Sequence, residues 1–391
     1  MAESKTSDST MDLDNFEPVA RIVVIGVGGA GNNAVNRMMD ENIANVEFYV
    51  MNTDKQALAT SKAPNRIVLG ETVTKGLGAG GEPSVGKEAA VQSTETIRKV
   101  VKGADMVFIA AGMGGGTGTG AAPIVAQIAR EEGALTIAIV TRPFTFEGKK
   151  RIQNSVTGLS DLKEAVDSII IVSNDKLLMS SGNAPISQAF QESDRVLAQS
   201  VKTVTDLILL PAVINLDFAD VRNTLKGSGI ALIGFGTGSG PNKAEEAAEN
   251  AINSPLLEAS ISGARRAICA VTCGANVSLY EAQECVNRII EQAGAAIDIK
   301  FGVAINEQLA DTILVSVIAS DFTEEYDFTA TPQFTMPTKR DQVGSGVDEA
   351  REKAVEASQG KTGDGGPEEE SVEEAILPNF LKGKIDPDKD E

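Results

Sequence analysis

Residues 112–120 read GMGGGTGTG, and this glycine-rich segment is the strongest indication of the fold. It directly follows residues 105–111 (DMVFIAA), an apolar run typical of a buried parallel strand. It directly precedes residues 121–131 (AAPIVAQIARE), which are typical of a helix with Pro123 in its first turn. Glycines let backbone N–H groups curl around an anion, and a helix N-terminus adds the positive end of its dipole. The order strand, glycine loop, helix therefore predicts a phosphate-binding loop.

Two side chains, Thr117 and Thr119, would add hydroxyl donors to this loop. The loop is not a Walker A motif, because no Gly-Lys-Ser/Thr follows it. A flexible glycine linker is the alternative interpretation, but a linker would not fit tightly between a buried strand and a helix.

The composition allows two domains with aliphatic cores and excludes several kinds of active site. The chain has 391 residues, of which 42% are hydrophobic but only 4% are aromatic. Histidine is absent, which excludes Ser-His-Asp and Cys-His nucleophiles and His-ligated metals. Acid–base chemistry would fall to Asp, Glu, Lys, Tyr or Cys. We interpret Cys269, Cys273 and Cys285 as reduced core residues of a cytosolic protein.

The formal net charge of −20 is concentrated at the two ends of the chain. Residues 1–20 carry −4 and residues 321–391 carry −11, whereas residues 21–320 carry only −5. This distribution disfavours nucleic-acid binding through a basic face. No signal peptide opens the chain and no apolar run reaches membrane-spanning length, so we expect no direct membrane insertion.

Strand-like and helical runs alternate along the first half of the chain, which predicts a parallel sheet covered by helices on both faces. The longest helical candidate, residues 186–210, places Phe190, Leu197, Val201, Val204 and Ile208 near one face, as core packing would require. Residues 225–320 are richer in strands, which predicts a smaller α/β domain with a mixed sheet. The predicted strands are residues 21–25, 46–52, 67–69, 105–111, 135–140, 168–172, 230–235, 267–273, 296–301 and 313–319, and the predicted helices are residues 32–40, 85–101, 121–131, 149–165, 186–210, 243–253 and 279–292.

A second glycine motif, Gly26-x-Gly28-x-x-Gly31, matches the dinucleotide fingerprint, with Asp54 near the end of the next strand. By itself it would suit a nicotinamide- or flavin-dependent dehydrogenase. Two such loops at the carboxyl ends of strands in one sheet suit a nucleoside triphosphate better, because one pyrophosphate needs only one loop. A third stretch, residues 75–81 (KGLGAGG), could close over a terminal phosphate, although an ordinary surface turn is the simpler interpretation.

Taken together, the motifs resemble the tubulin/FtsZ superfamily of GTPases, and within it the FtsZ family of bacterial cell-division proteins. The resemblance covers about residues 21–320, in order and without large gaps. It rests on residues 26–33 (GVGGAGNN), 114–120 (GGGTGTG), 143–151 (PFTFEGKKR), 174–176 (NDK) and 215–221 (NLDFADV).

This resemblance implies a Rossmann-like parallel-sheet GTPase domain joined by a long central helix to a smaller α/β domain with a mixed sheet. The segments would be a disordered arm (1–20), the GTP-binding domain (21–185), the central helix and catalytic loop (186–224), the C-terminal α/β domain (225–320), a disordered acidic linker (321–375) and a docking peptide (376–391).

The resemblance also implies which residues hold GTP or GDP. Glu147 and Arg151 would bind the ribose and its surroundings, Phe190 would stack on the base, and Asn174 and Asp194 would read guanine. An Asp carboxylate can accept the N1 and N2 protons of guanine, which adenine does not offer. On the residues alone, Phe190 could instead be a core residue, and Glu147 with Arg151 a surface ion pair. The phosphates would lie on the backbone of Gly29, Ala30, Gly31, Asn32, Asn33, Gly114, Gly115, Gly116, Thr117 and Gly118, with Ala79 and Gly80 near the γ-phosphate.

For catalysis, the resemblance implies Asn215, Asp217 and Asp220, on a loop that completes the site of the neighbouring subunit. Two acids can orient and polarise a water molecule near a Mg²⁺-bound phosphate, and the metal would have no certain protein ligand. A head-to-tail contact that does not close forms filaments, so hydrolysis would depend on assembly. On the residues alone, Asp217 could simply cap the following helix.

The resemblance further implies a cytoplasmic protein that forms the division ring at midcell. The segment Leu377-Pro-Asn-Phe-Leu381 would dock a membrane adaptor and division regulators at the end of a flexible tether. The family's peptide usually has Asp and Arg where this chain has Ala375 and Lys382. A chance apolar island is the alternative interpretation of this segment.

Two other functions stay open on the sequence alone. A Rossmann oxidoreductase needs neither the second glycine loop nor residues 215–220. A superfamily member that binds GTP without hydrolysing it would not need both Asp217 and Asp220.

Overall fold

The structure is a computed structural model of the chain. It describes residues 20–181, 185–209, 212–254, 256–257, 259–294 and 297–323. The chain divides into two compact units, residues 1–330 and 331–391, and every described residue belongs to the first unit. Most of the predicted arm and linker, and all of the docking peptide with Leu377 and Leu381, lie outside the described residues.

Ten strands form one sheet in the order β3-β2-β1-β4-β5-β6-β7-β10-β8-β9. Strands β1 to β6 pair in parallel, as the alternating pattern predicts. In the C-terminal part, β10 lies antiparallel between β7 and β8, and β8 and β9 are parallel, which confirms the predicted mixed sheet. The strands are β1 (Ile22–Val27), β2 (Glu47–Asn52), β3 (Asn65–Val68), β4 (Met106–Gly112), β5 (Leu135–Arg142), β6 (Ser168–Ser173), β7 (Gly229–Ser239), β8 (Ala264–Cys273), β9 (Asp298–Ile305) and β10 (Thr312–Phe322).

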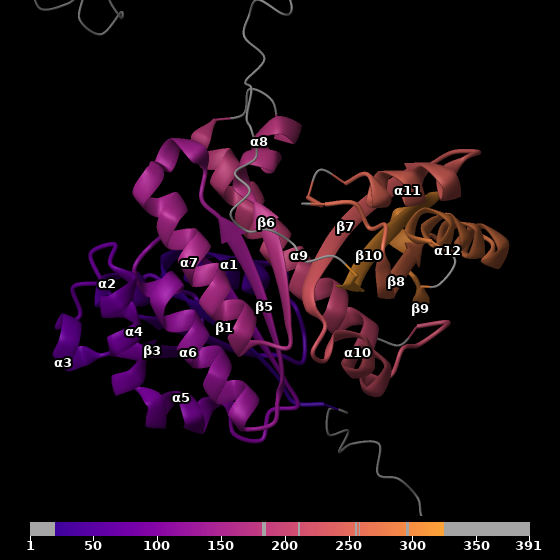
Figure 1. Cartoon of the computed structure of the whole chain (residues 1–391). Helices are drawn as coiled ribbons and strands as arrows, with labels where there is room; N and C mark the ends of the chain where they lie inside the picture. Colours follow the sequence, from indigo (N-terminus) through magenta and orange to yellow (C-terminus); the bar gives the residue numbers. More distant parts are fainter. Residues whose placement is uncertain are drawn as a thin grey trace, which may run out of the picture. The chain divides into compact units, whose positions relative to one another are not determined.

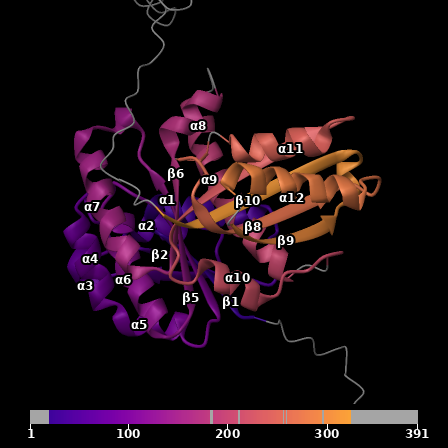
Figure 2. The same cartoon turned by 45° about the vertical axis from the view of Figure 1, so that its right-hand side comes forward.

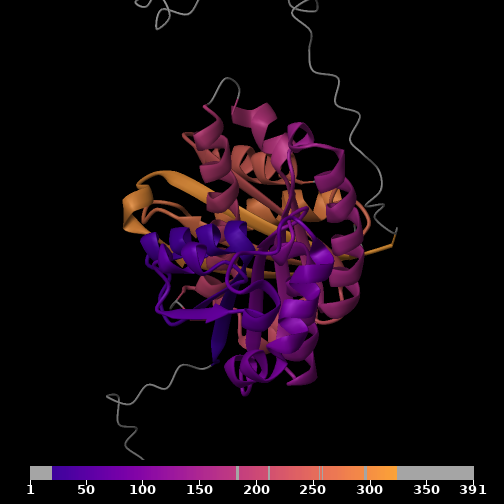
Figure 3. The same ribbon diagram turned by 90° about the vertical axis from the view of Figure 1, so that its left-hand side faces the viewer.

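Helices flank this sheet (Figures 1 and 2), and Figure 3 shows the same arrangement from the side of β3 and α3. None of the helices in the described ranges combines the length and apolarity that crossing a membrane requires. The helices are α1 (Gly28–Asp40), α2 (Lys55–Ala59), α3 (Glu71–Thr74), α4 (Pro83–Gln92), α5 (Thr94–Val101), α6 (Thr117–Glu131), α7 (Lys149–Ala165), α8 (Asn174–Ser181), α9 (Ile186–Leu209), α10 (Phe218–Leu225), α11 (Lys243–Ile252) and α12 (Leu279–Ala293), with short 3-10 turns η1 (Thr145–Glu147) and η2 (Glu307–Leu309).

The central strands are buried on both faces, because successive side chains of a strand point to opposite sides. Ile22 and Val24 of β1 belong to a core that includes residues of α1 and α9. Val23 and Ile25 belong to a second core, which residues of α4, α5, α6 and α7 complete. Burial on both faces explains why these strands read as continuous apolar runs.

The central helix α9 has 24 residues, which gives it a length of about 36 Å at 1.5 Å per residue. Leu197, Val201 and Val204 are fully buried against the sheet, as the apolar stripe predicts. Phe190 does not belong to this core: its residue is 41% exposed, and its ring meets Phe144 edge-on with the centroids 5.0 Å apart. The prediction that Phe190 packs in the core was therefore wrong. The helical spacing was extended to a part of α9 that does not cover the sheet.

The glycine-rich loop is shorter than predicted, because α6 already begins at Thr117. Pro123 accordingly lies inside the helix and not in its first turn. A Cβ on Gly120 would lie 1.9 Å from the carbonyl oxygen of Pro83, so glycine here permits α4 and α6 to pack closely. The predicted helix 85–101 is likewise two helices, α4 and α5, which are separated at Ser93.

Candidate functional site

The strand order reverses between β1 and β4, because β1 leads to β2 on one side and β4 leads to β5 on the other. In open α/β sheets, ligands bind in the crevice outside the carboxyl ends of the strands at such a point. Helix α1 begins at Gly28, directly after β1, and α6 begins after the short loop that follows β4. The two helix N-termini adjoin, since a Cβ on Gly28 would lie 2.8 Å from the Gly118 nitrogen. Both helix dipoles therefore favour an anion in this crevice.

Two glycines of the crevice, Gly29 and Gly115, are explained neither by their backbone nor by their neighbours. Every other glycine that the structure describes either has a left-handed φ or would bring a Cβ within 4 Å of another atom. Gly29 and Gly115 have an ordinary φ and open space beside them. Their lack of a side chain therefore fits the close approach of a ligand to the backbone.

The backbone of the glycine loop is held by threonine hydroxyls. Thr119 Oγ1 accepts a hydrogen bond from the Gly114 nitrogen at 2.8 Å, and Thr119 is buried. The hydroxyls of Thr53 and Thr117 share a hydrogen bond at 2.7 Å. Thr119 thus stabilises the loop by accepting a hydrogen bond from its backbone. The sequence had instead suggested that the Thr119 hydroxyl would donate to the phosphate.

The Asn32 side chain fixes the connection between β1 and α1. With its amide nitrogen turned toward the β1–α1 connection, Asn32 donates to the carbonyl oxygens of Gly26 and Gly28 at 3.1 and 2.9 Å. Asn32 is buried, whereas Gly29, Ala30 and Asn33 are exposed along the first turns of α1. The Asn32 side chain therefore shapes the loop and leaves the exposed positions to a ligand.

The third glycine-rich stretch, residues 75–81, lies against the glycine loop. Asn154 Nδ2 of α7 donates to the carbonyl oxygens of both Gly81 and Gly114 at 3.3 Å. A Cβ on Gly116 would lie 2.8 Å from the Cβ of Ala79. The structure thus brings Ala79, with Gly80 next to it, to the crevice.

The predicted ribose pair sits on η1 and α7. Glu147 Oε1 accepts a hydrogen bond from the Phe144 nitrogen at 2.9 Å, and the other carboxylate oxygen pairs with Arg151. Phe144 also stacks on Phe146, and Phe190 reaches this ring pair from α9. The Glu147–Arg151 ion pair is present, and the partly exposed Phe190 ring is available to a planar base.

The predicted guanine readers lie at the carboxyl end of β6 and on α9. Asn174 is buried and its Oδ1 accepts a hydrogen bond from Ser193 Oγ at 2.9 Å. Next to Ser193, burial raises the pKa of Asp194 to about 7, although the charge of Arg37 lowers it. A carboxyl group that is desolvated in this way gains most from a ligand that offers hydrogen-bond donors.

Asn215, Asp217 and Asp220 are not part of this assembly. Asn215 Oδ1 accepts a hydrogen bond from the Ala212 nitrogen, and Asp217 Oδ1 caps α10 by accepting from the Asp220 nitrogen, both at 2.7 Å. These residues follow the C-terminal end of α9, whereas Asp194 lies near its N-terminal end. The helix between Asp194 and Leu209 spans about 22 Å. Figure 1 shows α8 at one end of α9 and α10 at the other.

Comparison with known proteins identifies the family. Residues 21–182 match the family model described as the GTPase domain of the Tubulin/FtsZ family, and residues 229–323 match the C-terminal domain of the FtsZ family. An FtsZ dimer from M. jannaschii is 40% identical, with a TM-score of 0.76 over 82% of this chain and 95% of that chain. The chain belongs to the FtsZ family.

A second M. jannaschii FtsZ structure, of a mutant, is 41% identical, with a TM-score of 0.76 over 79% of this chain and 93% of that chain. CetZ2 from Haloferax volcanii, in a GTPγS-bound protofilament, has a TM-score of 0.68 over 86% of this chain and 99% of that chain. Because it is only 20% identical, it shows the fold alone. Membership of the FtsZ family confirms the predicted resemblance, the fold class and a GTPase that binds guanine nucleotide.

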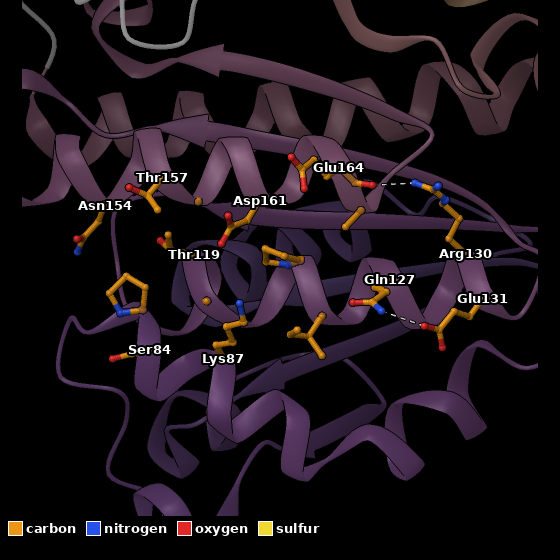
Figure 4. A pocket seen from close by; sticks show the side chains of 16 residues that line it. Ser84, Lys87, Thr119, Gln127, Arg130, Glu131, Asn154, Thr157, Asp161 and Glu164 are labelled. Atoms are coloured by element: carbon orange, nitrogen blue, oxygen red, sulfur yellow. Dashed lines mark hydrogen bonds between the residues drawn. The ribbon is translucent and has the colours of Figure 1, made fainter.

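Neither Gly29 nor Gly115 lines either of two cavities in this FtsZ-family chain. The larger, of about 740 Å³, is a groove between α4, α6 and α7 (Figure 4). The other, of about 430 Å³, lies between α9 and strands β8, β9 and β10. Within the described ranges, no three Asp, Glu or Cys side chains gather where they could hold a metal ion.

Sequence reasoning missed Thr53, Asn154 and Ser193, whose partners lie 64, 73 and 19 residues away in the chain. None of the three carries a local sequence signal, because their partners are set by the tertiary fold.

Proposed function

We propose that this chain is a polymerising GTPase that assembles head to tail into protofilaments and hydrolyses GTP between consecutive subunits. The observation that carries the proposal is the separation of the phosphate crevice from the exposed acid Asp217 by most of the length of α9. A single chain holds both halves of a hydrolytic site but cannot bring them together. A second copy, stacked so that its α9–α10 loop faces the crevice, would complete the site. The relative from M. jannaschii was solved as a dimer.

In this proposal the crevice holds the nucleotide. The N–H groups at the starts of α1 and α6 receive the phosphates, and Ala79 and Gly80 lie near the γ-phosphate. Phe190 covers the base, and Glu147 with Arg151 borders the ribose. Asp194 accepts the N1 and N2 protons of guanine, which selects GTP over ATP.

The α9–α10 loop supplies the water-activating groups of the neighbouring subunit. Asp217 and Asp220 orient the attacking water and accept its proton, and Asn215 holds the loop that carries them. Asp217 keeps one carboxylate oxygen for this task, because Oδ1 already caps α10. A Mg²⁺ ion bound by phosphate oxygens would neutralise charge on the nucleotide, and no protein ligand is proposed for it.

Two substitutions at one position separate catalysis from helix capping. Asn caps helices as well as Asp does, so Asp217→Asn keeps α10 but removes the charge, whereas Asp217→Ala removes both. We expect both variants to bind GTP and to lose about a hundredfold or more in kcat. Wild-type turnover per subunit should also rise with protein concentration. Full activity of Asp217→Asn, or a turnover that is independent of concentration, would refute the shared site.

A mixing experiment tests the assignment of the two half-sites. Gly29→Ala should damage the nucleotide crevice and leave the α9–α10 loop intact, whereas Asp217→Asn does the reverse. In an equal mixture roughly one interface in four pairs an intact crevice with an intact loop, so part of the wild-type activity should return. If the mixture stays as inactive as its components, hydrolysis does not occur between subunits.

The cellular role follows from the family. We infer that the filaments form the division ring at midcell in the cytoplasm, and that residues 376–391 with Leu377–Leu381 dock a membrane adaptor and division regulators. The support for this part is the family membership and the sequence of the tail.

A further inference from the structure

We propose that Asn154 is a positioning residue that clamps the third glycine-rich stretch, residues 75–81, to the glycine loop and thereby sets how long GTP stays bound. This proposal rests on the nucleotide crevice proposed above. Asn154 lies on α7, outside the predicted site, and Figure 4 shows it at the same end of the α4–α6–α7 groove as Thr119.

The geometry of Asn154 is that of a bridge. An amide nitrogen carries two hydrogens, and both acceptors of Asn154 Nδ2, the carbonyl oxygens of Gly81 and Gly114, lie at 3.3 Å. Gly81 and Gly114 have φ values of +77° and +102°, which favour glycine. One side chain thus ties together two loops that approach the crevice from different parts of the chain.

The bridge fixes a backbone donor of the crevice. The N–H of Gly114 is held by Thr119 and its C=O by Asn154, so the residue is constrained on both sides. The described chain has no cis peptide bond, and in a trans peptide the next N–H points opposite to the C=O. The N–H of Gly115 therefore points away from Asn154, beside the open space that we assign to the phosphates. Without the bridge this N–H is free to turn.

The bridge also holds the loop that reaches the γ-phosphate. The Glu82 nitrogen donates to the Ala79 carbonyl oxygen at 3.0 Å, which closes the turn that presents Ala79 and Gly80. Lys150, one helical turn before Asn154, pairs with Glu82. Both partners of that ion pair are exposed, so it contributes little by itself. The hydrogen bond from Asn154 to Gly81 is a second polar link between α7 and this turn.

The test measures nucleotide dissociation from the full chain after a chase with excess nucleotide. Asn154→Leu has a similar size but no donor, and Asn154→Gln retains the amide. Gln153→Ala is the matched control, because Gln153 is the exposed neighbour on α7 and its side chain makes no hydrogen bond with the described residues. The probes are fluorescent GTPγS, which retains the γ-phosphate, and fluorescent GDP, which lacks it.

We expect Asn154→Leu to release GTPγS about tenfold faster, which corresponds to about 1.4 kcal/mol. GDP should be affected less, because it does not reach the turn at Ala79. Asn154→Gln should recover part of the retention, Gln153→Ala should match the wild type, and the nucleotide-free unfolding temperatures should agree. An unchanged GTPγS release rate in folded Asn154→Leu overturns the clamp, as does equal acceleration of both nucleotides together with a lowered unfolding temperature.

Gly115→Ala in the same series separates this proposal from the proposed crevice. If Gly115→Ala weakens binding and Asn154→Leu does not, the clamp fails and the crevice stands. If neither variant changes nucleotide binding, the crevice itself is misplaced and the clamp falls with it.

Discussion

Asp194 is predicted to destabilise the nucleotide-free protein for the same reason that it would recognise guanine. Burial raises its pKa from 3.8 to about 7 in the folded chain. A carboxyl group whose pKa is raised on folding does not destabilise the folded state below its unfolded pKa. As the pH rises from the unfolded pKa to the folded pKa, the folded state loses stability. The affected window therefore runs from about pH 4 to about pH 7.

The size of the effect follows from the two pKa values. At 1.36 kcal/mol per pKa unit, the raised pKa of Asp194 lowers the free energy of unfolding by about 4 kcal/mol at pH 8 and by about 1.5 kcal/mol at pH 5, compared with a carboxyl group whose pKa does not change on folding. Asp194→Asn removes the charge and keeps the shape. We expect the substitution to raise the free energy of unfolding of the nucleotide-free chain, and to raise it more at pH 8 than at pH 5. The same variant should bind GTP at least tenfold more weakly, because it loses charge-assisted hydrogen bonds.

Denaturant unfolding without nucleotide at pH 5 and pH 8, with a parallel GTP titration, measures both effects. Asp161→Asn is the control, since Asp161 is an exposed carboxylate on α7 and lies outside the crevice. If the stability difference between Asp194→Asn and the wild type does not change with pH, burial does not raise the pKa of Asp194. If stability changes as expected but GTP binding does not, Asp194 lies outside the base site.

The remaining predictions concern two glycines and the tail. Gly115→Ala should leave the unfolding temperature unchanged and weaken GTP binding at least tenfold, because its Cβ would enter space that only a ligand fills; unchanged binding in a fluorescence titration would contradict this. Gly120→Ala should do the opposite and destabilise the chain by about 1–3 kcal/mol, because its Cβ meets the Pro83 carbonyl oxygen; a wild-type unfolding curve would rule out that close packing. Removal of residues 376–391 should preserve GTPase activity and abolish adaptor binding in a pull-down assay, and retention of binding would exclude the docking role.

The sequence predicted the strands and the long helices well, because burial on two faces and helical amphipathicity leave local patterns. Helix 149–165 was predicted at the residues where α7 begins and ends. The start of α6 was missed because glycine was interpreted as a helix breaker, whereas Gly120 serves a contact with α4. Phe190 was misplaced because periodicity indicates a face of a helix and not how far the sheet extends beneath it.

The candidate site was likewise predictable from the sequence only in part. The glycine motifs are visible in the local sequence, and the structure places them at one crevice. Asn154 has no motif, because it acts on carbonyl oxygens 40 and 73 residues away. The raised pKa of Asp194 likewise depends on burial by distant elements, which the sequence does not display.

The junction between β6 and β7 has a mechanical consequence. Only Ser168–Ile170 pair with Gly229–Ala231 there, whereas β7 and β10 pair along nine positions. A bending load on the sheet would break the fewest hydrogen bonds at this short seam. Rocking of the C-terminal strands against the parallel strands therefore breaks the fewest strand-pairing hydrogen bonds at this seam, and the strands on either side can stay paired.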